Sequence, residues 1–406
     1  MLYRLHFRLK ETNQLMLSSP QSQQARKAQN QHFTAQKGGF KISIMVIEVV
    51  NVLGLDIGGA NTKASFMKTQ DATIQELRTA IEYFPVWKKG KEQLPKVLEK
   101  LKKRLVESAL DGVGVTITAE LSDAYIAKKE GVHHVLDCVT EVFGDVPTFV
   151  LDVEANLLSI KDAQREPLKV ASANWAATGW MISQLIKNCI VVDVGSTTTS
   201  IIPVINGKIA AEGRTDLEKL QNGELVYSGS LRTNVAAIVN GIPVRGKMAR
   251  VSSELFAQSG DVHLILGNIE KEEYSAETCD GRGKTRREAM ARLARVVCAD
   301  TDMLTEQEIV DIAKFVYDKQ VEQISGGLKQ VYERIKQSLQ EKVVVVVTGL
   351  GRNFLARKAA ENAGFKDIIS IEKYLGADAT VVSPSVGVAL MLASKLEGKL
   401  VRWKQS

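Results

Sequence analysis

Two short segments of this chain place an aspartate, glycines and hydroxyl or amide side chains in the same order. The first reads Leu-Asp-Ile-Gly-Gly-Ala-Asn-Thr-Lys over residues 55–63. Glycines that follow a strand let the backbone approach a ligand and adopt positive φ, and their N–H groups can hold phosphate oxygens. Asp56 is placed to bind a hydrated Mg²⁺, and Lys63 adds a cation. The predicted phosphate-binding residues here are Gly58, Gly59, Asn61 and Thr62.

Taken alone, this segment is equally typical of a Gly-Gly hairpin turn with a solvated aspartate. The second segment, Val-Asp-Val-Gly-Ser-Thr-Thr-Thr-Ser over residues 192–200, repeats the order of strand, aspartate, glycine and hydroxyl donors. Threonine also favours strands in general, but two such segments together predict two loops that face one phosphate chain. Asp56 and Asp193 are then the predicted catalytic groups and metal ligands. The second set of phosphate-binding candidates is Gly195, Ser196, Thr197 and Thr198.

A third segment, Val-Thr-Gly-Leu-Gly-Arg-Asn over residues 347–353, is typical of a strand, a Gly-x-Gly turn and a helix start. Helix N-termini attract anions, although a tight turn is the simpler interpretation of this segment alone. Alongside the other two, it predicts that Gly349 and Gly351 contribute to phosphate binding. A dinucleotide-binding fold is disfavoured, because the GxGxxG spacing is absent and a strand follows the first segment.

The elements that must position these loops alternate between strands and helices. The first half predicts strands at 52–56, 63–68 and 73–83, a helix at 92–108, a strand at 113–118, a helix at 134–143, a strand at 148–151 and a helix at 170–186. The pattern then restarts with strands at 190–194 and 198–204, a hairpin turn at 205–208, a buried strand at 343–347 and a helix at 353–363. Because the two halves begin with a similar series of strands, the sequence predicts two duplicated α/β domains.

This pattern also divides the chain. We expect a first lobe at 46–188, a second lobe at 189–384 with an inserted region at about 209–342, and a helix at 385–400 that packs back onto the first lobe. Residues 1–45 lack patterned apolar positions. They predict a disordered tail, a transit peptide, or a start assigned too early, with the true start at Met45.

Composition excludes several classes of protein. The net charge of +6 comes from residues 1–45, which hold seven Lys/Arg and one acid, so the remaining 46 basic and 46 acidic residues balance. A nucleic-acid footprint is therefore not expected, and no apolar run approaches the ~20 residues that would span a membrane. The four cysteines form no CxxC pair and, like the histidines, show no metal-ligand spacing. We expect a cytoplasmic protein.

The three glycine-containing segments resemble the phosphate-1, phosphate-2 and adenosine motifs of the actin/Hsp70/sugar-kinase (ASKHA) superfamily, which implies two ribonuclease-H-like lobes with a phosphate-binding cleft between them. The hydantoinase-A/oxoprolinase branch is the most similar. Further segments resemble a tetrahydromethanopterin-linked one-carbon family that includes the furan-methanamine ether synthase of methanofuran biosynthesis. These segments are 118–123, 129–131, 173–175, 223–227, 231–234, 280–284 and 293–300. One departure is Ser200, because the family's second motif usually continues Thr-Thr-Thr-Asp.

The resemblance implies a transferase that condenses 5-(aminomethyl)-3-furanmethanol diphosphate with γ-glutamyltyramine, forming an ether and releasing diphosphate. The protein would stabilise the departing diphosphate through N–H groups, Mg²⁺ and cations. A phenol has a pKa of about 10 and needs a base. Glu120 is our first candidate and Asp193 our second, although Glu120 is also typical of a charge at a helix start.

A basic loop is the last predicted part of this site. Residues 280–285, Asp-Gly-Arg-Gly-Lys-Thr, are not a P-loop, because Thr278 stands where that motif requires glycine. They are typical either of a loop that closes over the diphosphate or of a solvated surface loop. The predicted substrate-contacting cations are Arg232, Arg282 and Lys284.

Two other functions stay open at this point. One is an ATP-dependent enzyme of the same fold, such as a kinase or amidohydrolase, with adenine bound near 349–353. The other is a nucleotide-switched chaperone or reactivating factor like Hsp70. A synthase would not require ATP, would take small-molecule substrates, and is compatible with a homo-oligomer.

Overall fold

The structure is a computed structural model that describes residues 34–37, 40–43, 49–339 and 343–403. The chain divides into two compact units, Met1–Glu48 and Val49–Ser406. In the first unit, β1 (Thr34–Lys37) and β2 (Phe40–Ser43) pair as an antiparallel hairpin. The remainder of the predicted tail or early start, 1–45, lies outside the described residues. No helix in the described ranges is long and apolar enough to cross a membrane.

The second unit begins with a six-stranded sheet in the order β5-β4-β3-β6-β7-β8. Its strands are β3 (Val49–Gly58), β4 (Asn61–Gln70), β5 (Thr73–Tyr83), β6 (Gly112–Thr118), β7 (Thr148–Leu151) and β8 (Leu157–Ser159). The first three form an antiparallel meander, while β6 adds parallel to β3 and β7 parallel to β6. The central strands are buried on both faces, which explains their continuous apolar runs.

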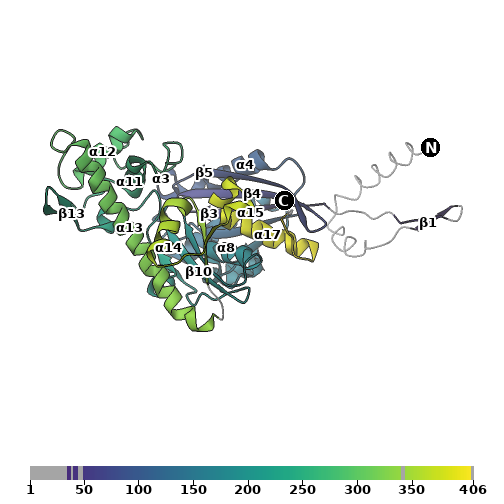
Figure 1. Cartoon of the computed structure of the whole chain (residues 1–406). Helices are drawn as coiled ribbons and strands as arrows, with labels where there is room; N and C mark the ends of the chain where they lie inside the picture. Colours follow the sequence, from purple (N-terminus) through teal and green to yellow (C-terminus); the bar gives the residue numbers. More distant parts are fainter. Residues whose placement is uncertain (1–33, 38–39, 44–48, 340–342, 404–406) are drawn as a thin grey trace. The chain divides into compact units, whose positions relative to one another are not determined.

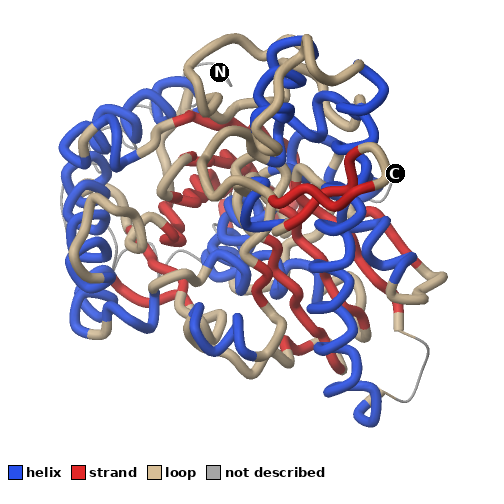
Figure 2. Tube along the Cα trace, turned by 90° about the vertical axis from the view of Figure 1, so that its left-hand side faces the viewer, coloured by secondary structure: helices blue, strands red, loops and turns tan. Residues whose placement is uncertain are grey.

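The second sheet repeats this plan in the order β11-β10-β9-β15-β16, with β12 paired to β10. Its strands are β9 (Cys189–Val194), β10 (Thr199–Ile205), β11 (Lys208–Ile209), β12 (Leu225–Val226), β15 (Val344–Gly349) and β16 (Ile368–Ser370). Again an antiparallel meander comes first, and β15 adds parallel to β9. Asp56 in β3 and Asp193 in β9 therefore occupy corresponding places. Figure 2 shows strands and helices of this unit interleaved, with helices along its outer sides.

Two helices, α8 (Asn174–Ser183) and α17 (Ser383–Glu397), pack against each other between the sheets. Helix α17 lies on β3, β4 and β6, and α8 lies on β10 and β11. Helix α17 lies very close to β3, because a Cβ added to Gly54 of β3 would lie 2.9 Å from the Ala389 Cβ of α17. The outer face of the first sheet is covered by α4 (Leu94–Leu105) and α5 (Lys128–Phe143). Shorter helices are α3 (Val86–Lys89), η1 (Lys91–Gln93), α6 (Ile160–Arg165) and α7 (Pro167–Val170).

The inserted region has a core of its own, at one end of the second unit in Figure 1. It contains α10 (Val235–Ile238), β13 (Gly241–Val244), β14 (Lys247–Arg250), α11 (Ser259–Leu266) and α12 (Arg286–Arg295). The 30-residue helix α13 (Glu306–Ile335) starts at a Thr305–Glu308 capping box. Its first half packs in this core and its second half packs against the second sheet, so α13 ties the two together. The remaining helices are α9 (Asp216–Gln221), η2 (Lys336–Ser338), η3 (Arg352–Ala356), α14 (Arg357–Asn362), α15 (Glu372–Leu375) and α16 (Ala377–Val381).

Most element predictions are confirmed, and the differences lie at the ends of elements. Helix α5 begins at Lys128, six residues before the predicted start, because Gly131 lets its first turn pack directly on Glu120. The predicted helix at 353–363 opens instead with the π-helical turn η3 and continues as α14. The helix predicted at 170–186 is split at Ser172, whose φ is +53°.

Candidate active site

A cleft of about 390 Å³ lies where the loops after β3 and β9 meet. From the first lobe it is lined by Asp56, Gly58, Gly59, Ala60, Asn61, Lys63, Trp87, Thr118, Leu121, Ser122, Asp123, Ser172, Asn174 and Trp175. From the second lobe it is lined by Asp193, Gly195, Ser196, Thr197, Thr198, Ser200, Asp216, Lys219, Leu225, Tyr227 and Arg232. The volume suits a small-molecule ligand.

Two aspartates at the ends of β3 and β9 lie in this cleft, Asp56 buried and Asp193 partly buried, and Lys63 lies beside Asp56. The Lys63 Nζ lies 3.5 Å from Asp56 Oδ2, and Thr178 donates a hydrogen bond of 3.3 Å to Asp193. Burial raises the pKa of Asp56, and it raises the pKa of Asp193 to about 6, while Lys63 opposes both shifts. The two lobes differ at this point. In the first sheet the residue opposite Asp56 on the neighbouring strand is Lys63, whereas in the second sheet the residue opposite Asp193 is Ser200.

The two phosphate loops touch each other across the cleft. Asn61 Nδ2 donates a hydrogen bond of 3.4 Å to Ser196 Oγ. Seven of the predicted phosphate-binding residues line the cleft, namely Gly58, Gly59, Asn61, Gly195, Ser196, Thr197 and Thr198. Thr62 does not, because β4 already begins at Asn61 and successive side chains of a strand point to opposite faces. Asn61 and Lys63 therefore face the ligand, and Thr62 is buried on the other face.

Gly349 and Gly351 are also absent from the cleft lining. Both pack directly behind the second loop. A Cβ added to Gly349, whose φ is +84°, would lie 2.5 Å from Asp193 Oδ1, and one added to Gly351 would lie 2.5 Å from Val194 Cγ1. The glycines are needed for close backbone packing that holds Asp193 in place.

We expect Gly349→Ala to destabilise the fold more than Gly364→Ala. Both positions have positive φ, but nothing lies within 4 Å of a Cβ on Gly364. The strained φ alone should cost about 1–2 kcal/mol in each variant, and the contact with Asp193 should add to this only in Gly349→Ala. Denaturant unfolding of both variants measures the difference. Equal losses would mean that β15 shifts to make room.

A second polar cluster joins the lobes at the cleft wall. Ser172 Oγ lies 2.6 Å from Glu120 Oε1 and 2.7 Å from Asp216 Oδ2. Lys128 Nζ lies 2.6 Å from the same Asp216 oxygen and 3.7 Å from Glu120. Burial raises the pKa of Glu120, opposed by the Ser172 hydrogen bond and Lys128. Glu120, the predicted base, lies behind Ser172 and does not line the cleft.

Arg232 is the predicted substrate cation that the structure does bring into the cleft. Its guanidinium carbon lies 4.6 Å from the ring centroid of Trp87, from the other lobe, and Nη1 donates a hydrogen bond of 3.2 Å to Thr197. Within the described residues no carboxylate pairs with it. The stacked cation is therefore available to an anionic ligand.

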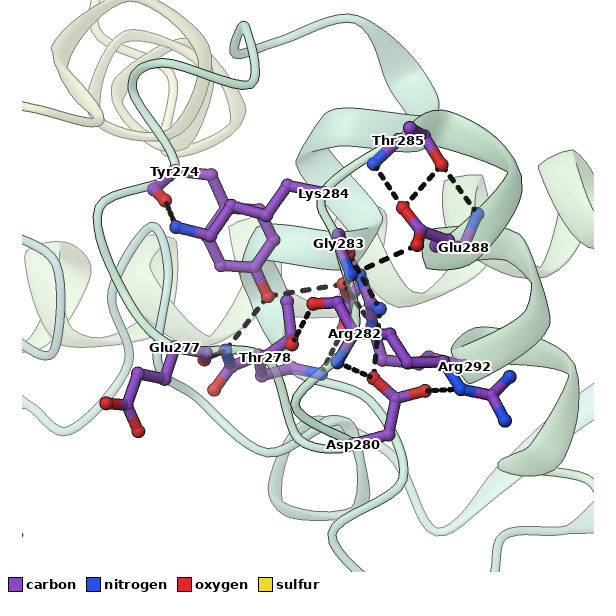
Figure 3. A network of polar contacts seen from close by, with 12 residues as sticks. Tyr274, Glu277, Thr278, Asp280, Arg282, Gly283, Lys284, Thr285, Glu288 and Arg292 are labelled. Atoms are coloured by element: carbon purple, nitrogen blue, oxygen red, sulfur yellow. Dashed lines mark hydrogen bonds and ion pairs between the residues drawn. The ribbon is translucent and has the colours of Figure 1, made fainter.

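Arg282 and Lys284, the other two predicted substrate cations, do not line the cleft and lie on the loop that Figure 3 shows. Lys284 Nζ contacts the carbonyl oxygen of Tyr274, and its ammonium lies 5.3 Å from that ring's centroid. The carbonyl of Arg282 accepts a hydrogen bond of 2.6 Å from Thr278. The polar contacts of this loop, residues 280–285, are therefore made within the inserted region and not with the ligand loops of the cleft.

The cleft fits a hydrated magnesium ion. Asp56 Oδ1 is buried and has no hydrogen-bond partner within the described residues. Those residues contain no cluster of three or more metal-ligating side chains. Asp56 and Asp193 are the cleft carboxylates on the two strands that lead into the ligand loops. One or two carboxylates plus phosphate oxygens and waters is the usual coordination of Mg²⁺.

Sequence reasoning missed Ser172, Asp216 and Lys219 as cleft residues. The family resemblance did include residues 173–175, which contain the cleft residues Asn174 and Trp175 and lie next to Ser172. The positive φ of Ser172 and the burial of Lys219 have no signature in a single sequence.

Two sheets with the same meander, each with an aspartate beside the shared cleft, are the architecture of the ASKHA class, so the predicted fold is confirmed. The sequence model of the Hydantoinase/oxoprolinase family matches residues 111–394. The chain belongs to this family, as its motifs predicted.

Two curated relatives carry the same name, (4-{4-[2-(gamma-L-glutamylamino)ethyl]phenoxymethyl}furan-2-yl)methanamine synthase. The protein from Methanocaldococcus jannaschii is 40% identical over 349 residues, which cover 86% of this chain and 99% of the relative. The protein from Methanococcus vannielii is 40% identical over 224 residues, which cover 54% of this chain and 98% of the relative. Both relatives are thus named as enzymes.

Solved structures are similar at lower identity. The ethanolamine utilization protein EutJ from Carboxydothermus hydrogenoformans is 14% identical, with a TM-score of 0.41 and coverage of 86% of this chain and 91% of that one. The ROK hexokinase from Thermus thermophilus is 14% identical, with a TM-score of 0.38 and coverage of 84% and 98%.

Proposed function

We propose that this chain condenses 5-(aminomethyl)-3-furanmethanol diphosphate with γ-glutamyltyramine and releases diphosphate, giving the aryl ether for which its relatives are named. The observation that carries the proposal is the cleft itself, where both glycine-containing loops meet two aspartates and two cations. The chain spans 99% of the Methanocaldococcus jannaschii relative at 40% identity, so the similarity is not confined to one part of that enzyme. The proposed reaction uses no ATP.

The first task of the site is to hold the diphosphate. The backbone around Gly58, Gly59 and Ser196 can supply N–H groups, and Lys63 and Arg232 supply positive charge. A magnesium ion on Asp56 and Asp193 would neutralise phosphate charge when bound. Donors that are already in position for the charge of the leaving group are usually the largest contribution to such catalysis.

The second task is to bring the two aromatic rings together without water. Trp87, Trp175 and Tyr227 line the cleft and offer faces for the furan and the phenol. The bond from the methylene carbon to the diphosphate oxygen breaks with its electron pair on oxygen, and the phenol oxygen forms the new bond to carbon. Two lobes around the site limit the access of water, which would otherwise trap a cation-like methylene carbon.

The test is an assay of the purified full chain with Mg²⁺, the furan diphosphate and γ-glutamyltyramine, without ATP. We expect the ether by mass spectrometry, with diphosphate released in equal amount and both products lost in EDTA. No ether, together with hydrolysis of added ATP, would overturn the proposal and favour an ATP-dependent enzyme of this fold. A protein client bound in equal amount would favour the chaperone alternative.

A further inference from the structure

Lys219 is a buried lysine that faces the cleft. It lies on α9, its side chain is 1% exposed, and it lines the cleft beside Trp175. The Nζ atom lies 3.5 Å from the Trp175 ring centroid. Among the residues that the structure describes, this nitrogen has no hydrogen-bond partner. A buried amine without a partner is costly for folding alone, so it calls for a functional explanation.

The two carboxylates nearest to Lys219 are already satisfied by other groups. Asp216 is paired with Lys128 and with the hydroxyl of Ser172. Glu224 accepts hydrogen bonds from the backbone N–H of Glu212 and Gly213 and is paired with Arg334. Neither carboxylate therefore fixes the ammonium form of Lys219.

The charge balance around Lys219 follows from these pairings. Burial is the main effect and lowers its pKa to about 7; Glu224 and Asp216 raise this pKa, while Arg214 and Arg334 lower it. A large share of the protein then carries Lys219 as a neutral amine at neutral pH. In this form the Nζ atom has a lone pair that can accept a proton, whereas an ordinary lysine would be a fixed cation.

We propose that Lys219 is the general base that takes the proton of the phenol, and this inference rests on the function proposed above. The Nζ lone pair accepts the phenol proton as the phenol oxygen bonds to the methylene carbon. The diphosphate leaves with the electron pair of the broken C–O bond, and the ammonium later returns its proton to water. Neither base expected from the sequence is as well placed, because Glu120 is outside the cleft lining and Asp193 lies beside Lys63.

The first test is Lys219→Met, which keeps the length of the side chain and removes the amine. We expect kcat for ether formation to fall by about 10²-fold, the lower range for loss of a general base. The melting temperature should not fall, because an apolar side chain suits the buried position better than an amine. Lys314→Met on α13 is the matched control, since that lysine is exposed and pairs only with Asp311; its kcat should match the wild type.

The second test separates a base from a structural lysine or an anion-binding one. Fluorinated γ-glutamyltyramines have more acidic phenols that need less help from a base. The loss of kcat in Lys219→Met should therefore shrink as the phenol becomes more acidic. The wild-type kcat should also fall below about pH 7 as the amine is protonated, and this limb should be missing in the variant.

A loss that is the same for every phenol, or a variant as fast as the wild type, would overturn the assignment of Lys219 and leave the proposed function intact. Wild-type protein that forms no ether from any of the phenols would instead overturn the proposed function itself.

Discussion

Asp56→Asn is expected to reduce kcat for ether formation by about 10³-fold, the upper range for loss of one electrostatic contact to a transition state. Asparagine has the same shape, so the end of β3 should stay in place. The charge of the carboxylate, which pairs with Lys63 and is available to a magnesium ion, is lost. The concentration of Mg²⁺ required for half-maximal activity should rise for the same reason.

Steady-state assays across a Mg²⁺ series measure both effects. Asp145→Asn is a suitable control, because that aspartate is exposed in the same lobe and its substitution should change neither quantity. If Asp56→Asn kept a third or more of wild-type kcat at every Mg²⁺ concentration, diphosphate departure would not depend on this carboxylate.

Arg292→Met is expected to destabilise the inserted region by about 3–5 kcal/mol, the usual cost of leaving one partner of a buried ion pair alone. The side chains of Arg292 and Asp261 are both fully buried, and two guanidinium nitrogens lie 2.8 and 2.9 Å from Asp261 Oδ1. A third nitrogen contacts Asp280 and the Gly283 carbonyl, as Figure 3 shows in part.

The matched control is Arg282→Met, on the loop that precedes α12. The Arg282 side chain is 68% exposed and its guanidinium lies 4.0 Å from Asp280, so the variant should lose at most about 1 kcal/mol. Urea unfolding, followed by hydrogen exchange of the amides in α11 and α12, measures the loss of stability in each of the two variants. Similar stabilities for the two variants would show that Tyr274 and Gln258, which also donate hydrogen bonds to Asp261, are sufficient on their own.

The elements of both sheets could be predicted because their signals are local. Runs such as residues 343–347 are apolar since β15 is covered on both faces, and each strand that carries a cleft aspartate ends near glycine. The fine placement of Thr62 could not be predicted. It depends on β4 starting at Asn61, two residues before the predicted start, which decides the face on which Thr62 lies.

The cleft residues supplied by α9 were hidden for a different reason. The helix reads Asp-Leu-Glu-Lys-Leu-Gln, a composition typical of a solvated surface. The burial of Lys219 depends on residues distant in the sequence, such as Trp175, 44 positions earlier, whose ring centroid lies 3.5 Å from the Lys219 Nζ. Conversely, Lys284 looked suited to a phosphate, but the carbonyl oxygen of Tyr274 in the inserted region accepts a hydrogen bond from its ammonium group. Arg282, on the same loop, is exposed and does not line the cleft.

The position of α17 has a consequence for how the protein is made. This is the last helix that the structure describes, yet it covers one face of the first sheet, with Ser385 hydrogen-bonded to Ser65 at 2.6 Å in the buried interior. On a ribosome that adds about 5–20 residues per second, the first sheet is complete long before residues 383–397 emerge. Its apolar face then stays uncovered for roughly 10–50 seconds, the time needed to add the residues between β8 and α17. The nascent first lobe should therefore be a client of chaperones, and the two lobes should complete their folding together, after synthesis.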